Sequence, residues 1–441
     1  MIGIKKPIFH GYHALTINKA FSMKKSCIGI IALLTIFFGI VHGASRSSSQ
    51  STKEHLCKEE LFYKHVPHKK GDPLRILFVV ESFPHFDQPF ILDQIVGVMN
   101  RGHEVYIAAR YEVKNNSIPD LVHQYKLMDR TLFFDKSNPL ELLQHNSRMP
   151  HINTFDVICC QFGNIGADMV RFKRGLSDIS AKLVTCWRGA AKEVTMQPYE
   201  YNALFKQGDL FLPVCEFLKN NIMDLGCNPN KIQVLYVGIK YDHYVCEHIA
   251  PRDGTINLMS ICRLVEKKGL EYAIRGVASL IKIYPHVHYT IVGDGPLKKH
   301  LKSVVERLHM QDHITFIGNQ PHEKIPELLR NADIFLSPSV TTSEGNHEGI
   351  ANSLKEAMAS GALVIATDHA GTSELIADGR SGFLVPERDS DALTEKINYL
   401  IAHPEIWDTV RLHGRQAVQE RFCLAGSVDQ FIAIIEGICV Q

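Results

Sequence analysis

Two glutamates eight residues apart, Glu348 and Glu356, are the side chains of this 441-residue sequence whose placement most clearly suggests chemistry. They lie in the run 343–361, where Asn352 is expected to cap a helix and Gly361 to follow its end. Free amides at such a helix start attract phosphate, which a carboxylate would repel. We therefore expect both glutamates to accept hydrogen bonds from sugar or ribose hydroxyls. Their spacing alone also fits acidic residues that stabilise a helix dipole.

A basic pair supplies the complementary charge. Arg263 and Lys268, five residues apart, follow an apolar run typical of a buried strand. A guanidinium can hold two phosphate oxygens and an ammonium is a movable point charge, so the pair suits a diphosphate. A solvated basic loop would explain the same residues. Gly293, after another apolar run, would either let backbone approach a ligand or form a plain strand-to-helix turn.

The elements that must position these residues alternate between strands and helices from Arg75 onward. Several apolar runs are continuous, as in parallel strands covered on both faces. This alternation predicts an α/β fold with two doubly wound units, which bind ligands at the carboxyl ends of their strands. The predicted strands are 75–80, 104–109, 155–160, 182–186, 209–214, 232–236, 256–261, 288–292, 313–317, 333–337 and 362–367. The predicted helices are 89–101, 216–225, 268–284, 296–309 and 352–360.

The domain boundaries are predicted where this pattern lapses. A hinge near Tyr244–Gly254 would separate an N-terminal domain at 73–245 from a C-terminal domain at 254–415. The tail from Asp389 to Val440 has three helical patterns and no strand pattern. Its last part, 416–441, would form a helix that either caps the second domain or crosses back to the first.

Residues 1–44 have a different character. Lys24 and Lys25 precede an apolar run at 27–41, and small residues follow it, so 23–44 has the layout of a secretory signal. The run is shorter than the roughly 20 residues that span a bilayer. The segment would therefore either export the protein or anchor it, and Met23 is an alternative start. Residues 45–72 are predicted to be a solvated linker.

Composition excludes several classes. With 48 basic and 47 acidic side chains, the net charge of +1 gives no overall attraction to nucleic acid. Eleven irregularly spaced cysteines favour reduced, packed thiols over a disulfide framework. Asp389-Ser390-Asp391 looks like a metal-binding D-x-D motif, but it opens a predicted helix and is expected to be a cap.

Residues from about 75 to 420 resemble the retaining GT-B glycosyltransferases of family 4. The most specific segment has Glu348 before Gly349-Ile350, then Glu356-Ala357-Met358-Ala359-x-Gly361. The similarity continues through 263–269, 292–296, 364–367, 370–375 and 378–386. In the first half, Phe83-Pro84, 88–94 and 101–105 look like the opening of the polysaccharide-assembly branch, and 213–218 and 231–239 match as well.

The resemblance implies two Rossmann-like domains facing a central cleft, with the nucleotide sugar on the second and the acceptor on the first. Arg263 and Lys268 would neutralise the diphosphate leaving group as its charge grows. Glu356 would bind the ribose and Glu348 the donor sugar, so Arg263, Lys268 and Glu348 would carry catalysis. Further donor contacts are expected at Gly293, Gly349, Ile350, Ala351 and Asn352. The family needs no bound metal, and no cofactor is expected.

Departures from the family pattern cluster on the acceptor side. Arg188 and Gln161 stand where histidines are common, and Lys240 stands where an aspartate often follows Val-Gly-Ile. Cys262 and Ala351 replace a usual glycine and proline on the donor side. These changes leave the acceptor, and turnover itself, open.

The leading hypothesis is a hexosyltransferase-type enzyme of the EC 2.4 class that uses a nucleotide-diphosphate sugar and a glycan or lipid-linked acceptor. Phe83 and Arg188 are its acceptor-side candidates. The alternatives are a catalytically weak sugar-nucleotide-binding partner in a glycan-assembly complex and a GT-B sugar-nucleotide epimerase. No nucleic acid partner is expected, and membrane contact stays open. We expect a cytoplasmic location, tethered or peripheral at the membrane, with export or a lumenal location through 23–44 as the alternative.

Overall fold

The computed structural model describes residues 71–440 apart from 85–87, 115–117, 174–178, 190–196 and 246–253. The signal-like segment, nearly all of the linker and most of the predicted hinge therefore lie outside the described residues. In the part of the chain that is described, no helix has the length and apolar character needed to cross a membrane.

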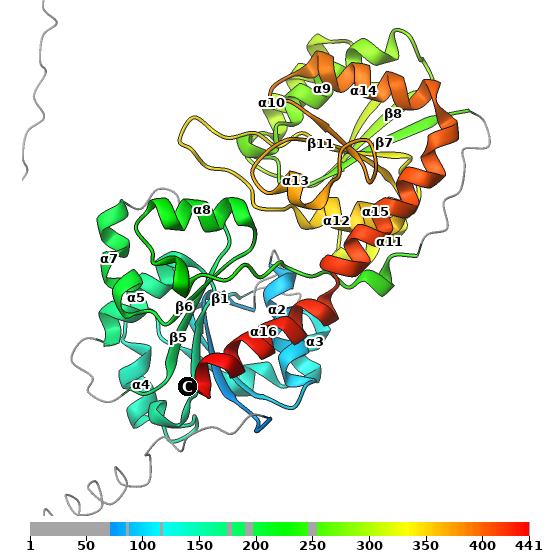
Figure 1. Ribbon diagram of the computed structural model, residues 1–441. Coiled ribbons are helices and arrows are strands. Elements are labelled where there is room, and N and C mark those ends of the chain that lie inside the picture. The colour runs from blue at the N-terminus through cyan, green and yellow to red at the C-terminus, as the bar shows by residue number, and fades with distance from the viewer. Residues whose placement is uncertain are drawn as a thin grey trace, which may run out of the picture. The chain divides into compact units, whose positions relative to one another are not determined.

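Two six-stranded parallel sheets form the framework (Figure 1). Their strand orders are β3-β2-β1-β4-β5-β6 and β12-β11-β10-β7-β8-β9. In each, the chain starts in the middle of the sheet and changes direction once, which is the doubly wound arrangement. This confirms the predicted α/β fold. The strands are β1 (Arg75–Phe83), β2 (Glu104–Glu112), β3 (Thr131–Phe133), β4 (Val157–Cys160), β5 (Lys182–Trp187), β6 (Leu210–Pro213), β7 (Ile256–Ile261), β8 (Val287–Val292), β9 (Ile314–Gly318), β10 (Ile334–Ser337), β11 (Leu363–Thr367) and β12 (Phe383–Val385).

Amphipathic helices cover the sheets. In α9, for example, Leu270, Ala273, Ile274, Val277 and Ile281 recur every three or four residues and all pack into the core of the second sheet. The helices are α2 (Pro89–Met99), α3 (Asp120–Gln124), α4 (Pro139–His145), α5 (Gly163–Lys173), α7 (Pro198–Gln207), α8 (Glu216–Asp224), α9 (Leu270–Ile281), α10 (Lys298–Arg307), α11 (Ile325–Arg330), α12 (Asn352–Ser360), α13 (Thr372–Leu375), α14 (Ser390–Ala402), α15 (Trp407–Arg421) and α16 (Leu424–Cys439).

The strand predicted at 232–236 is wrong. Its backbone donates hydrogen bonds to Phe211 and Pro213 of β6, but Ile232 forms only an isolated bridge. The segment instead leads the chain away from the first sheet. Two strands, β3 and β12, were not predicted, because three residues are too short to show a hydrophobic period.

The C-terminal helices divide between the two sheets. Helix α15 contacts α12 and β11 of the second sheet, whereas α16 contacts α2 of the first (Figure 1). Val428, Phe431 and Ile435 of α16 share a hydrophobic core with strand β1. At the start of α14, Asp389 accepts a hydrogen bond from the backbone of Ala392, which confirms that Asp389 is a helix cap.

Candidate active site

The loops after β7 and β10 lie where the strand order of the second sheet reverses, the usual ligand-binding position of such sheets. They are 262–269 and 338–351, and the backbone N–H of Val340 donates to the carbonyl of Lys267 at 2.9 Å. Gly269 has a φ of +58°, and a Cβ there would lie 1.8 Å from the carbonyl oxygen of Pro338. Glycine is therefore needed for the two loops to approach each other.

Glu348 lies between two lysines of the opposite loop. Its Oε1 is 2.9 Å from Lys267 Nζ and its Oε2 is 3.2 Å from Lys268 Nζ. The exposed fractions are 17% for the Glu348 side chain, 11% for Lys267 and 14% for Lys268, so water screens these ion pairs weakly. Burial opposes ionisation of Glu348, but the charges of Lys268 and Lys267 outweigh it and lower its pKa to about 2. At neutral pH the carboxylate is therefore ionised, and it can accept hydrogen bonds but not donate them.

Glu356 is buried near the start of α12 and is already hydrogen-bonded. Its Oε1 lies 3.1 Å from Nε2 of His322, and this hydrogen bond raises the pKa of His322. Tyr244 lies near Glu356, and burial followed by the nearby Glu356 charge raises the pKa of the Tyr244 hydroxyl. A carboxylate in these surroundings can equally accept from the vicinal hydroxyls of a ribose.

Helix α12 has the predicted bounds, but its N-cap is a different residue. Ala351 is its N-cap and Asn352 is its first helical residue, so the predicted Asn352 cap is wrong. No side chain caps this helix start, and the amides there suit an anion. At the other end, Gly361 has a φ of +84°, which confirms the predicted glycine stop.

The other predicted donor residues lie in the same group of loops. Arg263 is exposed after β7, and within the described residues no carboxylate is paired with it. Gly293 has a φ of +133°, and a Cβ there would lie 1.9 Å from the carbonyl of Cys262, so glycine allows the loops after β7 and β8 to touch. Gly349 and Ile350 form the backbone that leads into α12.

Lys267 is the residue that sequence reasoning missed in this group. It neighbours Lys268, and nothing in the sequence distinguishes the two lysines except their distance from Arg263. The structure shows that both reach the same carboxylate, one at each oxygen. Spacing alone could not reveal this, because Glu348 is 81 residues from Lys267 in sequence.

On the first sheet, Arg188 follows β5 and lies against Gln161, the other residue that stands where a histidine is expected. Its Nη2 is 2.6 Å from Oε1 of Gln161 and 2.9 Å from Oε1 of Gln94. Its guanidinium also lies 4.9 Å from the ring centroid of Phe90. These three neutral groups help to orient the guanidinium. Together with Phe90 and Gln94, Arg188 lines a small hollow.

Phe83, the second acceptor-side candidate, is placed differently. It is the last residue of β1, only 4% of its surface is exposed, and it packs in the core with Ile91 and Ile95. In this conformation its side chain is not available to a ligand. Of the two candidates, only Arg188 lines the hollow.

Comparison with known proteins was consistent across sequence and fold. Residues 248–416 match the family model described as glycosyl transferases group 1. The chain is 29% identical over 367 residues to the putative colanic acid biosynthesis glycosyltransferase WcaL of Salmonella typhimurium, an alignment that covers 74% of this chain and 90% of that protein. It is 28% identical over 368 residues to the amylovoran biosynthesis glycosyltransferase AmsK of Erwinia amylovora, covering 73% and 89%. Among solved structures, HepE of Anabaena in complex with UDP-glucose superimposes with a TM-score of 0.66 at 18% identity, covering 82% of this chain and 100% of that one.

Proposed function

The chain belongs to the group 1 glycosyltransferases and has the GT-B fold, and on that premise we propose that it is a retaining enzyme of polysaccharide assembly. It takes a sugar from a nucleotide-diphosphate donor and transfers it to a glycan or lipid-linked acceptor. The observation that carries this proposal is the contact between Lys268 and Glu348 at the switch point of the second sheet. It places a cation suited to phosphate beside a carboxylate suited to sugar hydroxyls. The names of WcaL and AmsK refer to colanic acid biosynthesis and amylovoran biosynthesis, and this supports a role in polysaccharide assembly.

Charge provides the catalytic argument. Arg263, Lys267 and Lys268 lie on one loop, and among the residues that the structure describes only Glu348 forms ion pairs with them. A leaving diphosphate gains negative charge as the glycosidic bond breaks, and preorganised cations stabilise that change most in a water-poor site. Phosphate oxygens compete with Glu348 for Lys268 when the donor binds. Lys267 then continues to hold Glu348, whose free lone pairs face the donor sugar.

The nucleoside end of the donor is assigned to Glu356. Its carboxylate accepts a hydrogen bond from His322 in the ligand-free protein and accepts from ribose hydroxyls in the complex. On the acceptor side, Arg188 at the hollow of the first sheet is the assigned contact. We propose no bound metal or other cofactor, because the cationic side chains of the loop after β7 supply the charge that a divalent ion would otherwise bring.

A ligand screen tests the donor assignment. Thermal shifts with UDP-, GDP- and ADP-sugars are measured first, and the expected result is stabilisation by one nucleotide class. Hydrolysis of that nucleotide sugar without acceptor is then followed by NMR, which also reports the anomer formed first. A product that keeps the donor's anomeric configuration supports the proposal, and an inverted product contradicts it. Binding without hydrolysis or transfer would indicate the sugar-nucleotide-binding partner instead.

The proposed location is the cytoplasm, with the chain tethered to or peripheral at a membrane. Nucleotide sugars are made and kept in the cytoplasm, so an exported enzyme would meet no donor unless its compartment imports one. The cysteines of the described residues are not in disulfide bonds, as expected of a reducing compartment.

A further inference from the structure

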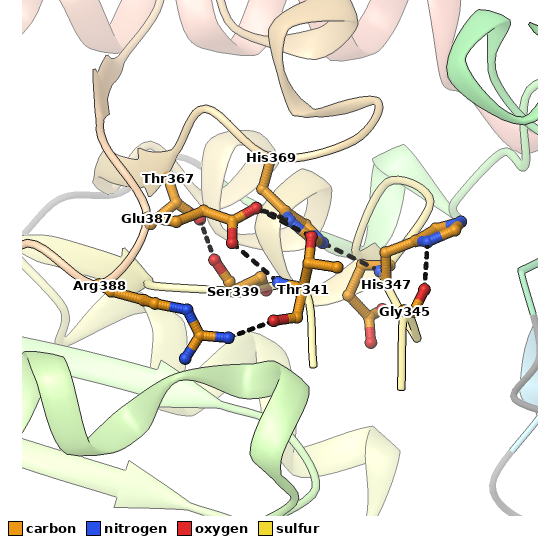
Figure 2. Close-up of polar contacts among 9 residues, drawn as sticks. Ser339, Thr341, Gly345, His347, Thr367, His369, Glu387 and Arg388 are labelled. Atoms are coloured by element: carbon orange, nitrogen blue, oxygen red, sulfur yellow. Dashed lines mark hydrogen bonds and ion pairs between the residues drawn. The ribbon is translucent and has the colours of Figure 1, made fainter. Parts of the chain in front are cut away.

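The backbone of Glu348 is held by a buried histidine from a third loop. The N–H of Glu348 donates to Nε2 of His369 at 3.0 Å. His369 follows β11, and only 2% of its surface is exposed. Figure 2 shows His369 inside a set of polar contacts that joins the loops after β10, β11 and β12. The position of Glu348 therefore depends on more than the two lysines that hold its side chain.

Glu387, just after β12, orients this histidine. The Nδ1 of His369 is 2.5 Å from Oε1 of Glu387. Burial opposes ionisation of Glu387, but hydrogen bonds from His369 and from the backbone of Thr341 lower its pKa overall. An ionised carboxylate only accepts hydrogen bonds, so the proton of His369 must be on Nδ1. Its Nε2 is then a bare lone pair that faces the amide of Glu348.

The same carboxylate also fixes the start of the Glu348 loop. Glu387 accepts from the backbone N–H of Thr341 at 2.8 Å and from its hydroxyl at 3.2 Å. Arg388 donates to the carbonyl of Thr341 (Figure 2). It also hydrogen-bonds, at 2.9 Å, to the hydroxyl of Tyr272. The loop is thus attached to Glu387 twice, directly at Thr341 and through His369 at Glu348.

We propose that His369 and Glu387 act as a positioning pair for the donor-sugar subsite. They hold the main chain of Glu348 so that its carboxylate meets the hydroxyls of the donor sugar. The inference rests on the proposed function, because that function assigns Glu348 to the sugar. In this proposal neither residue contacts the nucleotide, so the pair affects the sugar-dependent step and spares binding of the nucleoside diphosphate.

Two variants separate the acceptor role of Nε2 from the donor role of Nδ1. In His369→Gln, an amide oxygen can occupy the place of Nε2 and accept from Glu348. In His369→Asn, the shorter amide reaches only the place of Nδ1, so the acceptor for Glu348 is lost. Amide hydrogen exchange of the 343–351 segment in the ligand-free protein reads this directly. We expect exchange at Glu348 to speed up about threefold to tenfold in H369N, the range for one lost hydrogen bond, and to stay near wild type in H369Q.

Kinetics with UDP-glucose and binding of UDP provide the functional readout. The expected result for H369N is a loss of about tenfold or more in kcat/KM for UDP-glucose hydrolysis, with the Kd for UDP within twofold of wild type. H369Q should recover most of that loss. Glu387→Gln, which keeps the side-chain shape and removes the charge, should also lower kcat/KM for UDP-glucose hydrolysis. The double variant with H369N should lose little more activity than H369N alone, because the two residues act as one unit.

The outcomes separate this inference from the proposed function. If wild-type protein neither binds nor hydrolyses UDP-glucose, that donor assignment fails, while the exchange rate at Glu348 still decides the positioning role. If H369N and H369Q change that exchange rate equally, or not at all, the inference is wrong. A parallel loss of UDP affinity and turnover would also contradict it. If H369N does not fold, E387Q supplies the same three measurements.

Discussion

Lys267 and Lys268 share one carboxylate, and the proposed mechanism gives them different tasks. Lys268→Gln should weaken UDP binding, because Lys268 turns to the diphosphate, whereas Lys267→Gln should mainly reduce turnover of UDP-glucose. A lost charge-assisted contact corresponds to about 1.5–3 kcal/mol in either case. Calorimetry with UDP and initial-rate kinetics with UDP-glucose measure the two effects. Lys→Arg at each position is the matched control, and identical profiles for K267Q and K268Q would contradict the division of tasks.

The two glutamates should also separate by ligand. Glu356→Ala and Arg263→Ala are expected to weaken binding of the nucleoside diphosphate by about 1.5–3 kcal/mol, since they contact ribose and phosphate. Glu348→Ala should largely spare that affinity and lower turnover of the intact donor. Unchanged affinity in both E356A and R263A would remove the basis for the donor-site assignment. An equal loss of both ligands in E348A would mean that Glu348 has another role.

At the scale of elements, helix α12 carries a buried lysine against the segment that leaves the first sheet. Lys355 is only 1% exposed, and its Nζ donates to the carbonyl of Val237 at 2.6 Å and lies 5.7 Å from the ring centroid of Phe422. Burial lowers its pKa from 10.5 to about 7. Between these two values the unfolded chain binds a proton that the folded chain does not, so stability gains with rising pH.

This titration predicts that the difference in free energy of unfolding between wild type and Lys355→Met depends on pH. The free energy of unfolding of wild type should increase relative to that of K355M as pH rises from about 7 to 9, with a slope approaching about 1.4 kcal/mol per pH unit. Urea unfolding at several pH values measures it, and subtraction of K355M removes the contribution of other titrating groups. A constant difference across that range would show that Lys355 keeps its proton in the folded state.

The elements differ in how far sequence could predict them. Strand β7 and helix α12 agree with the prediction because their apolar patterns are long and bounded by polar residues or glycine. The run 232–236 is also mostly apolar, yet it contacts β6 only through two backbone hydrogen bonds and an isolated bridge and forms no strand. An apolar pattern does not by itself specify regular strand pairing.

Sequence could also predict only part of the candidate site. Lys268 and Glu348 were predicted from family-like spacing, and the structure brings them together. His369 and Glu387 were not predicted, because they act on Glu348 through hydrogen bonds that join residues 21 and 18 positions apart in sequence. The rule that ligands gather after parallel strands would have selected both loops, but not which of their side chains faces Glu348.

At the scale of the whole molecule, the kinds of charged side chain that are grouped together indicate whether a metal is required. Within the described residues, no group of three or more His, Cys, Asp or Glu side chains is arranged to hold a metal. Three basic side chains of one loop lie at the proposed diphosphate site instead. We expect transfer or donor hydrolysis to be unaffected by EDTA and not to increase with added manganese or magnesium. Activity lost on chelation and restored by either ion would overturn this expectation.

The compartment in which the whole chain works depends on its N-terminal segment and on where the donor is available. Lys24 and Lys25 precede the apolar run at 27–41, and this charge order would by itself direct the following domains outward. The donor requirement favours the opposite side, because a charged nucleotide sugar made in the cytoplasm does not cross a membrane unaided. We expect a C-terminally tagged chain to resist protease added to intact cells and to become sensitive after lysis, with a cytoplasmic protein as the control. Cleavage from outside, or a mature N-terminus at Ala44 or Ser45, would place the domains outside and require a compartment that imports the donor.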